Sequence, residues 1–262
     1  MPVHNGVTYH ILKNSIKSCL NNSILPKQFL IIINGSLDQQ KKLYLFDLKK
    51  KHKNIEIHYC DKVGIHNALN LGIKKTKFNT IIRADADDYN VVKRFEKQLH
   101  FFRKNNLDVL GCENLEIYNQ NYTYKKKINK DPKIINFLFR NPINHMTTVF
   151  KKNKIELLGV YPNIPYKEDY ALWFKAYLFN FKIKNMNEIL VHTNINEKFF
   201  KRRKSLLSLL SEFKLVLFLI KINYLIGFLM IFICLMRSLI LLLPNIIFKY
   251  IYKFILRKKT IK

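Results

Sequence analysis

Residues 80–88 read Thr-Ile-Ile-Arg-Ala-Asp-Ala-Asp-Asp, a short apolar run followed at once by a cluster of carboxylates. The run at 80–82 predicts a buried strand, because it is short, β-branched and ends at polar residues. Ligands of open α/β sheets bind outside the carboxyl ends of the strands. The segment therefore predicts an α/β fold with a ligand site at this strand end.

The three carboxylates of this segment, Asp85, Asp87 and Asp88, crowd negative charge into a turn. Such crowding is unfavourable unless a cation neutralises it or water solvates the loop well. Hard oxygen ligands at close spacing suit Mg²⁺ or Mn²⁺, and these ions also bind substrate phosphate oxygens. The segment taken alone is equally compatible with a plain Asp-rich turn.

The flanking sequence alternates apolar runs with amphipathic stretches, which is typical of an α/β domain. Apolar or alternating runs predict strands at 29–33, 55–59, 80–82, 107–110 and 146–150. Helical spacing and capping residues predict helices at 38–50, from 64, at 92–102, from 132, and after 169.

Composition limits the class of protein. The formal net charge is +28, which favours contact with phosphates of nucleotides, anionic lipids or nucleic acid. The four cysteines are scattered without zinc-ligand spacing, so a reducing cytosolic compartment is expected. The opening residues show no basic segment leading into an apolar one, so we do not expect secretion.

The character of the chain changes near residue 200, so we predict a catalytic domain over 1–200 and a basic, hydrophobic helical tail over 201–262. Glu212 is the last acidic residue. The apolar stretch 222–236 is shorter than the roughly 20 residues of a spanning helix. We therefore expect membrane-associated helices, as a hairpin or lying in the interface, with Lys and Arg reaching the headgroups. The basic and aromatic residues of 249–259 suit an anionic leaflet.

Five blocks, in order along residues 1–200, resemble the family 2 inverting glycosyltransferases of the GT-A fold, in particular the bacterial surface-polysaccharide group of amylovoran or lipooligosaccharide type. The blocks are MPVHNG at 1–6, the Gly64 helix with ALNLG at 68–72, RADADD at 83–88 with RFEKQ at 94–98, NPINH at 141–145, and EDYALW at 168–173. The resemblance implies a GT-A-like nucleotide-binding sheet flanked by helices.

By this resemblance, Asp85 would hold the ribose of a nucleotide-activated sugar, and Asp87 with Asp88 would bind Mg²⁺ or Mn²⁺ at the donor diphosphate. Asp169, assisted by Glu168, would act as general base and take the proton from the acceptor hydroxyl. The reaction would invert the configuration of the anomeric carbon. Without the neighbouring blocks, the last two residues also read as an acidic pair at a helix start.

Several other residues are candidates for the nucleotide and acceptor sites. Pro2, Val3 and Asn34 fall where the family binds the nucleotide. Lys62 and Arg83 could hold anionic groups of the donor, or could simply be solvated cations. His145 reads either as a contact to phosphate or acceptor or as a packed, satisfied side chain. Trp173 reads as core because its helix neighbours are apolar.

The sequence departs from the family pattern at the donor pocket. The chain begins inside the expected first strand, so this strand is predicted to be truncated. His4 replaces the usual Tyr, and Asn34 replaces an Asp that reads the base, keeping an acceptor oxygen but losing the charge.

The leading hypothesis is a metal-dependent inverting hexosyltransferase that extends a surface glycan, with a nucleotide-sugar donor and a lipid-linked glycan acceptor. We expect it at the cytoplasmic face of a bacterial inner membrane, peripheral or monotopic through its tail. The alternative is a truncated, non-catalytic remnant that binds membrane or nucleotide. A nucleic-acid binder ranks last, because only the charge supports it and no binding motif is present.

Overall fold

The computed structural model describes residues 1–118, 122–126, 128–195, 197–244, 247, 250 and 258–260. The strands are β1 (Pro2–Val3), β2 (Phe29–Asn34), β3 (Ile55–Cys60), β4 (Thr80–Ile82), β5 (Asp88–Asn90), β6 (Val109–Tyr118), β7 (Tyr122–Lys125), β8 (Val149–Lys151), β9 (Ile183–Ile195) and β10 (Lys258–Thr260). The α-helices are α1 (Tyr9–Leu20), α2 (Gln39–Lys51), α3 (Ile65–Lys75), α4 (Arg94–Lys104), α5 (Ile134–Phe139), α6 (Lys152–Leu157), α7 (Glu168–Leu178), α8 (Glu197–Arg203), α9 (Leu206–Ile222) and α10 (Tyr224–Leu242), with a 3₁₀ turn η1 (His145–Thr147).

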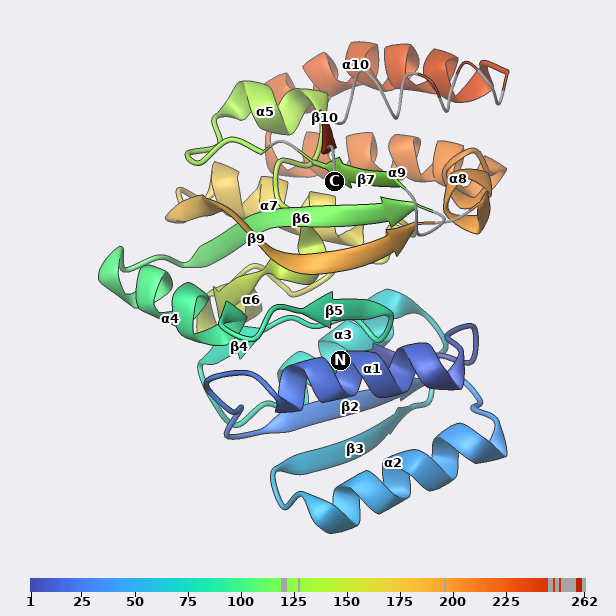
Figure 1. Ribbon diagram of the computed structural model, residues 1–262. Helices are drawn as coiled ribbons and strands as arrows, with labels where there is room; N and C mark the ends of the chain where they lie inside the picture. Colours follow the sequence, from blue (N-terminus) through green and yellow to red (C-terminus); the bar gives the residue numbers. More distant parts are fainter. Residues whose placement is uncertain are drawn as a thin grey trace.

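The N-terminal half is built on the parallel sheet β1-β2-β3. Strand β2 is apolar up to Asn34 at its end, because both of its faces are covered. Ile31 and Ile33 pack in a core with residues of α1 and α2, while Leu30 and Ile32 pack against Ala68 of α3. This arrangement puts α1 and α2 on one face of the sheet and α3 on the other (Figure 1). The strands and helices predicted for this half are therefore confirmed.

The second sheet runs β10-β7-β6-β8-β4, with β9 pairing with both β6 and β5.

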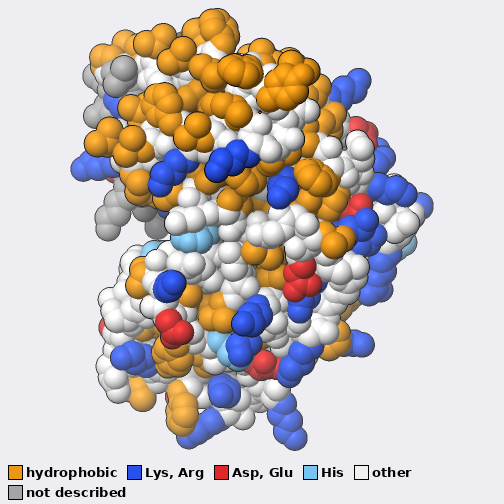
Figure 2. All heavy atoms as spheres, turned by 180° about the vertical axis from the view of Figure 1, so that it is seen from behind, with side chains coloured by type: hydrophobic (Ala, Val, Ile, Leu, Met, Phe, Trp, Pro, Cys, Tyr) orange, Lys and Arg blue, Asp and Glu red, His pale blue; other side chains and the backbone are white. Residues whose placement is uncertain are grey.

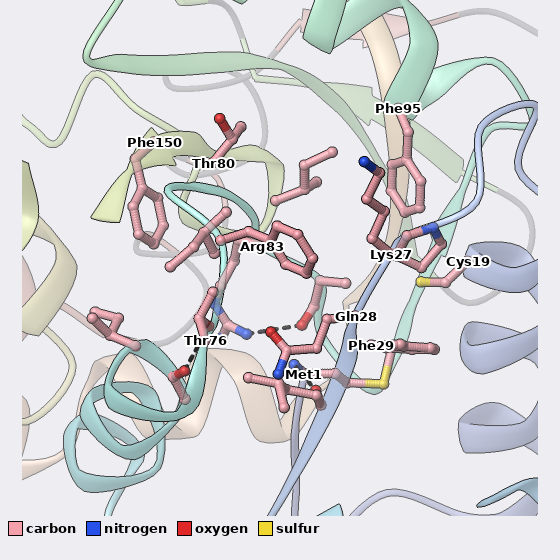
Figure 3. A pocket seen from close by; sticks show the side chains of 18 of the residues that line it. Met1, Cys19, Lys27, Gln28, Phe29, Thr76, Thr80, Arg83, Phe95 and Phe150 are labelled. Carbon is pink, nitrogen blue, oxygen red and sulfur yellow. Dashed lines mark hydrogen bonds between the residues drawn. The ribbon is translucent and has the colours of Figure 1, made fainter. Parts of the chain in front are cut away.

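Strand β1 of the first sheet covers only the end of β2, with Pro2 opposite Ile32 and Val3 opposite Ile33. A largely apolar cavity of about 440 Å³ lies beside it, lined from Met1, β2 and β4 among others (Figure 3). Strand β1 has two residues.

Two predicted boundaries are wrong. The segment 146–150 is not a continuous strand, because η1 occupies its first part and β8 begins at Val149. The Thr147 hydroxyl donates to the Asn144 carbonyl at 2.7 Å, a local bond that competes with sheet pairing. Helix α5 begins at Ile134 and not at Pro132, because Asn136 and Lys133 form a reciprocal cap.

Helices α9 and α10 form an antiparallel hairpin at one end of the molecule, stacked above α7 and the second sheet (Figure 1). The inner face of the hairpin belongs to the large core: Leu215, Leu219, Met230 and Cys234 pack in one cluster with Trp173. The predicted domain boundary at residue 200 falls inside α8. Within the described part of the chain, no helix is both long enough and apolar enough to cross a bilayer.

The outer face of the hairpin is apolar and exposed. Its exposed residues recur at helical spacing: Leu206, Leu210, Phe213 and Leu217 on α9, and Leu225, Phe228, Phe232, Leu235 and Leu239 on α10. Figure 2 shows hydrophobic side chains gathered over this end of the molecule. In the basic run 249–259, Lys258 and Lys259 lie in β10 on the edge of β7, and residues 249, 253 and 257 lie outside the described residues.

Candidate active site

The acidic segment follows β4 and enters β5, so it crosses the carboxyl edge of the sheet as predicted. Arg94 of α4, which is fully buried, holds the segment in place. Its guanidinium donates to the carbonyls of Arg83 at 2.7 Å and Met146 at 3.0 Å, and to the side chains of Asn90 and Gln98. Because Arg94 spans four elements, the loop that carries the carboxylates has a fixed shape.

The carboxylates of Asp85, Asp87 and Asp88 lie close together, with ligand atoms within 4.8 Å of one another. Limited solvation, followed by the charge of Asp85, raises the pKa of Asp87. Burial, followed by the charges of Asp85 and Asp87, raises the pKa of Asp88 well above its ordinary value. The positive charges around the loop therefore do not fully compensate the negative charge of its three carboxylates.

A divalent cation fits this cluster. Asp88 is buried, and its Oδ2 has no hydrogen-bond partner among the described residues. A carboxylate oxygen left without a partner beside two further carboxylates is the donor set that Mg²⁺ or Mn²⁺ takes. Asp85 differs from the other two because Arg83 pairs with it.

Arg83 is buried at the end of β4 and points into the apolar cavity beside Met1 (Figure 3). Its guanidinium pairs with Asp85 and donates to the Ala84 carbonyl at 2.8 Å. Arg83 therefore neutralises Asp85 in this structure. The carboxylates themselves lie outside that cavity.

The second acidic pair, Glu168 and Asp169, occupies the first turn of α7 as predicted. The Asn141 amide donates to Asp169 Oδ2 at 2.8 Å, which fixes that carboxylate. Burial, followed by the charge of Asp169, raises the pKa of Glu168 to about 7. Glu168 Oε2 is buried and unpartnered within the described chain. The pair thus contains one oriented carboxylate and one that readily holds a proton.

His145 lies beneath this pair in η1. Its Nε2 is 3.0 Å from the Tyr161 hydroxyl, and its ring packs edge-on against Trp173. Burial, followed by the charge of Arg83, lowers the pKa of His145 to about 4, so the ring is neutral near neutral pH. These contacts are those of a packed, satisfied side chain. Trp173 is fully buried, which confirms the prediction that it belongs to the core.

The residues predicted to contact the nucleotide lie at the ends of β1, β2 and β3. Pro2 and Val3 are buried, so these two side chains support the sheet edge from inside. The Asn34 amide oxygen accepts from the Gly64 amide at 2.9 Å, which ties β2 to the start of α3. Lys62 is exposed and lines a cleft of about 640 Å³ with Gly64, Tyr166 and their neighbours.

Charge effects relate the two acidic groups to each other. His4 and Arg202 both act to lower the pKa of Asp87, and Arg202 acts in the same direction on Glu168. Asp169 and Asp85 both act to raise the pKa of His145. Both acidic groups therefore contribute to the electrostatic potential at His145, and Arg202 of α8 contributes to the potential at both groups.

Sequence reasoning gave no role to Arg94, Gln98, Asn141 or Arg202. Arg94, Gln98 and Asn141 belong to the sequence blocks that resemble family 2 glycosyltransferases, and their place in these blocks was the signal that could have identified them. Arg202 lies in a basic run, where a functional cation looks the same as a solvated one.

The family model described as Glycosyl transferase family 2 matches residues 1–206. The chain is 30% identical over 252 residues to an Escherichia coli UDP-Gal:alpha-D-GlcNAc-diphosphoundecaprenol beta-1,3-galactosyltransferase, covering 94% of this chain and 91% of the relative. It is 27% identical to the amylovoran biosynthesis glycosyltransferase AmsE of Erwinia amylovora, covering 78% of each chain.

Solved structures share the fold. The Staphylococcus aureus TarS 1–349 structure matches with a TM-score of 0.64 at 14% identity, covering 84% of this chain and 64% of that one. The Pyrobaculum calidifontis mannosyltransferase PcManGT, solved with GDP-Man and Mn²⁺, matches with a TM-score of 0.62 at 11% identity, covering 84% of this chain and 62% of that one. These likenesses confirm the expected GT-A-like α/β fold.

Proposed function

This chain belongs to glycosyl transferase family 2, and from that premise we propose that it transfers a hexose from a nucleotide diphosphate sugar to a lipid-linked glycan acceptor, with inversion, in surface polysaccharide or lipooligosaccharide synthesis. The single observation that carries the proposal is the presence of two acidic groups at the ends of elements, whose charges both act on the buried ring of His145. Three carboxylates stand at the end of β4, and Glu168 and Asp169 stand at the start of α7. A relative that acts on a diphosphoundecaprenol acceptor supports the lipid-linked class.

The reaction needs a base placed opposite the leaving group. The acceptor hydroxyl oxygen forms a bond to the anomeric carbon as the bond from that carbon to the donor phosphate oxygen breaks, and a single displacement of this kind inverts the centre. The hydroxyl proton passes to Asp169. Asn141 holds Oδ2 of Asp169, which leaves Oδ1 to accept that proton. Glu168 would assist Asp169 as general base.

The donor binds along the carboxyl edge of the first sheet. Asp85 would hold the ribose, while Lys62 and Asn34 would contact the nucleotide from the ends of β3 and β2. Asp87 and Asp88 would hold Mg²⁺ or Mn²⁺, which supplies electrostatic stabilisation of the charge on the departing diphosphate when it is bound. A structural relative solved with Mn²⁺ supports this metal. The charge of Arg202 acts to lower the pKa of Asp87, so it adds positive potential at the cluster.

We place the enzyme at the cytoplasmic face of the inner membrane. The exposed apolar face of the α9–α10 hairpin would lie in the headgroup region, where an apolar stripe flanked by cations binds best. Lys214 is exposed on α9 and would contact anionic headgroups. The acceptor lipid would then reach the site from the same surface.

The test is transfer from a panel of nucleotide sugars, UDP-galactose included, to a synthetic lipid-diphosphate-linked N-acetylglucosamine acceptor in the presence of Mn²⁺. We expect transfer with one donor, a product of inverted configuration by NMR, and loss of about 10³-fold in rate in Asp169→Asn, the scale of removing a general base. Binding of nucleotide without transfer across the panel would favour the non-catalytic alternative. Full activity of a folded Asp169→Asn variant would exclude this base.

A further inference from the structure

The hairpin is tied to the start of α7 by a group of buried side chains. Glu212 of α9 is 3% exposed, and its carboxylate accepts from Lys167 Nζ at 2.6 Å and pairs with Arg237 of α10 at 3.3 Å. The Arg237 guanidinium also donates to the Tyr170 hydroxyl at 2.7 Å and to the Leu138 carbonyl at 2.7 Å. We call these four side chains, Lys167, Tyr170, Glu212 and Arg237, the hairpin network.

The network contradicts one expectation from the sequence. Arg237 does not reach outward to lipid headgroups; it lies beneath the hairpin, with its guanidinium 5.2 Å from the centre of the Tyr170 ring. Burial alone would raise the pKa of Glu212, but the charges of Lys167 and Arg237 outweigh it and hold that pKa below its ordinary value. The carboxylate is therefore ionised between its two cations, and α9 and α10 meet the catalytic domain through charge as well as apolar packing.

The network contacts both supports of Asp169. Lys167 is the N-cap of α7 and Tyr170 stands in its first turn, so the two flank Glu168 and Asp169 in the sequence. On the other side, Arg237 binds the carbonyl of Leu138 near the end of α5, three residues before Asn141. Asn141 is the residue that holds Asp169 Oδ2. One guanidinium thus contacts a side chain of α7 and a backbone carbonyl of α5, the helix that precedes Asn141.

From this arrangement we infer that Glu212 and Arg237 are positioning residues for the acceptor base, so that the membrane-facing hairpin is a working part of the active site. The inference rests on the proposed function, in which Asp169 is the base. A displacement of about 1 Å at a reacting group lowers rates by about 100-fold, so restraints of this kind matter. The donor loop after β4 is held separately, by Arg94. Loss of the network should therefore change catalysis and leave donor binding intact.

The experiment compares full-length Arg237→Met and Glu212→Gln with Lys221→Met, which removes an exposed charge from the same hairpin. We expect kcat to fall about 30- to 100-fold in the two network variants, with KM for the donor within about 3-fold of wild type, because only the base is displaced. Arg237→Lys keeps the charge beside Glu212 and should recover part of the rate. Lys221→Met should match wild type.

A measurement that does not depend on turnover separates the positioning role of the hairpin network from the proposed function. Amide hydrogen exchange of residues 167–171 should be faster in Arg237→Met than in wild type, and unchanged in Lys221→Met. Wild-type protein that shows no transfer would overturn the proposed function, while exchange would still test the network. Active wild type with equal kcat and equal exchange in both network variants would overturn the positioning role. A parallel rise in donor KM would also overturn it, since that points to general loosening of the fold.

Discussion

Arg94 shows at the residue scale why the acidic loop has one shape. The side chain is fully buried, and its bonds reach β4, β5, α4 and η1. Burial lowers its pKa, yet the four acceptors around it keep the guanidinium satisfied. A buried cation of this kind stabilises only while all of its partners are present.

Replacing Arg94 with Met should therefore destabilise the protein strongly. We expect a loss of about 3–5 kcal/mol in the free energy of unfolding, because several buried acceptors lose their donor. Urea denaturation followed by circular dichroism measures it. Arg103, exposed on the same helix, gives the matched control, and Arg103→Met should cost less than about 0.5 kcal/mol. Equal losses of unfolding free energy in the two variants would show that the hydrogen bonds of Arg94 do not stabilise the protein.

Asp88 gives a second residue-level prediction. A carboxyl with a raised folded-state pKa costs folding free energy once the pH exceeds its unfolded pKa, so Asp88→Asn should raise the melting temperature by about 3–6 °C at about pH 8 in EDTA. The same change should remove most of the melting shift that Mn²⁺ causes in the wild type. Asp47→Asn, on the exposed side of α2, should do neither. An undiminished Mn²⁺ shift in Asp88→Asn would exclude Asp88 as a ligand.

Glu168 should make stability depend on pH. Its folded pKa is about 7 against an ordinary 4.5, so the unfolded chain ionises first and the free energy of unfolding falls as pH rises between these values. Glu168→Gln should remove that loss, stabilising by about 2–3 kcal/mol at about pH 8 and by nearly nothing at about pH 4. Denaturant titrations at both pH values measure it, with Glu156→Gln as the exposed control. Stabilisation of equal size at both values would contradict the assigned pKa.

At the scale of elements, the two faces of the hairpin differ in what surrounds them. Its inner face contributes to the core that surrounds Trp173, and its outer face presents the exposed apolar stripes. Removing the whole tail would therefore expose the core as well as abolish membrane contact. Point changes on the outer face are the cleaner probe.

The double variant Phe228→Asp with Phe232→Asp should release the enzyme from membranes without unfolding it. These rings are 62% and 65% exposed, so they can gain burial only against a partner such as lipid. Losing two of them should lower vesicle partitioning by at least about 100-fold, because roughly 1.5–3 kcal/mol for each buried side chain amounts to about 3–6 kcal/mol for the pair. The matched control is Leu43→Asp with Phe46→Asp on α2, each residue 54% exposed. Similar losses in both doubles would mean that the hairpin is not the docking face.

At the scale of the whole molecule, the charge of +28 acts together with the apolar end. Cations near an anionic leaflet contribute about 1 kcal/mol each, and this contribution falls with salt. Wild-type binding to phosphatidylglycerol vesicles should thus have a salt-sensitive part and a salt-resistant part. In the Phe228/Phe232 double variant only the salt-sensitive part should remain. Sedimentation with vesicles across a potassium chloride series checks this, and salt-resistant binding by the variant would contradict it.

The sequence by itself determined the class of fold and the place of the two acidic groups at the ends of elements. Residues 80–88 combine a strand with a carboxylate cluster, and the helix beginning at Glu168 carries its acidic pair in the first turn, so short-range patterns were enough. Periodicity and capping depend on neighbours in the chain, and they also predicted α2 and α3. For the tail, a helical hairpin was one of the two forms expected. The predicted boundaries at Val149 and Ile134 were wrong, and side chain to backbone hydrogen bonds of Thr147 and Asn136 lie at these places.

Only the tertiary structure decided which charges meet. Arg94 and Asn141 hold the two acidic groups through contacts 11 to 52 residues distant in the chain, and Arg237 binds Leu138 across 99 residues. The sequence favoured an outward Arg237, because a cation beside an apolar stretch usually reaches water or headgroups. Its actual partners come from α5, α7 and α9, and no periodicity encodes them. Burial and long-range pairing depend on how the chain packs in space, so the positions of these charges, and the link between the hairpin and the base, emerge only in the folded molecule.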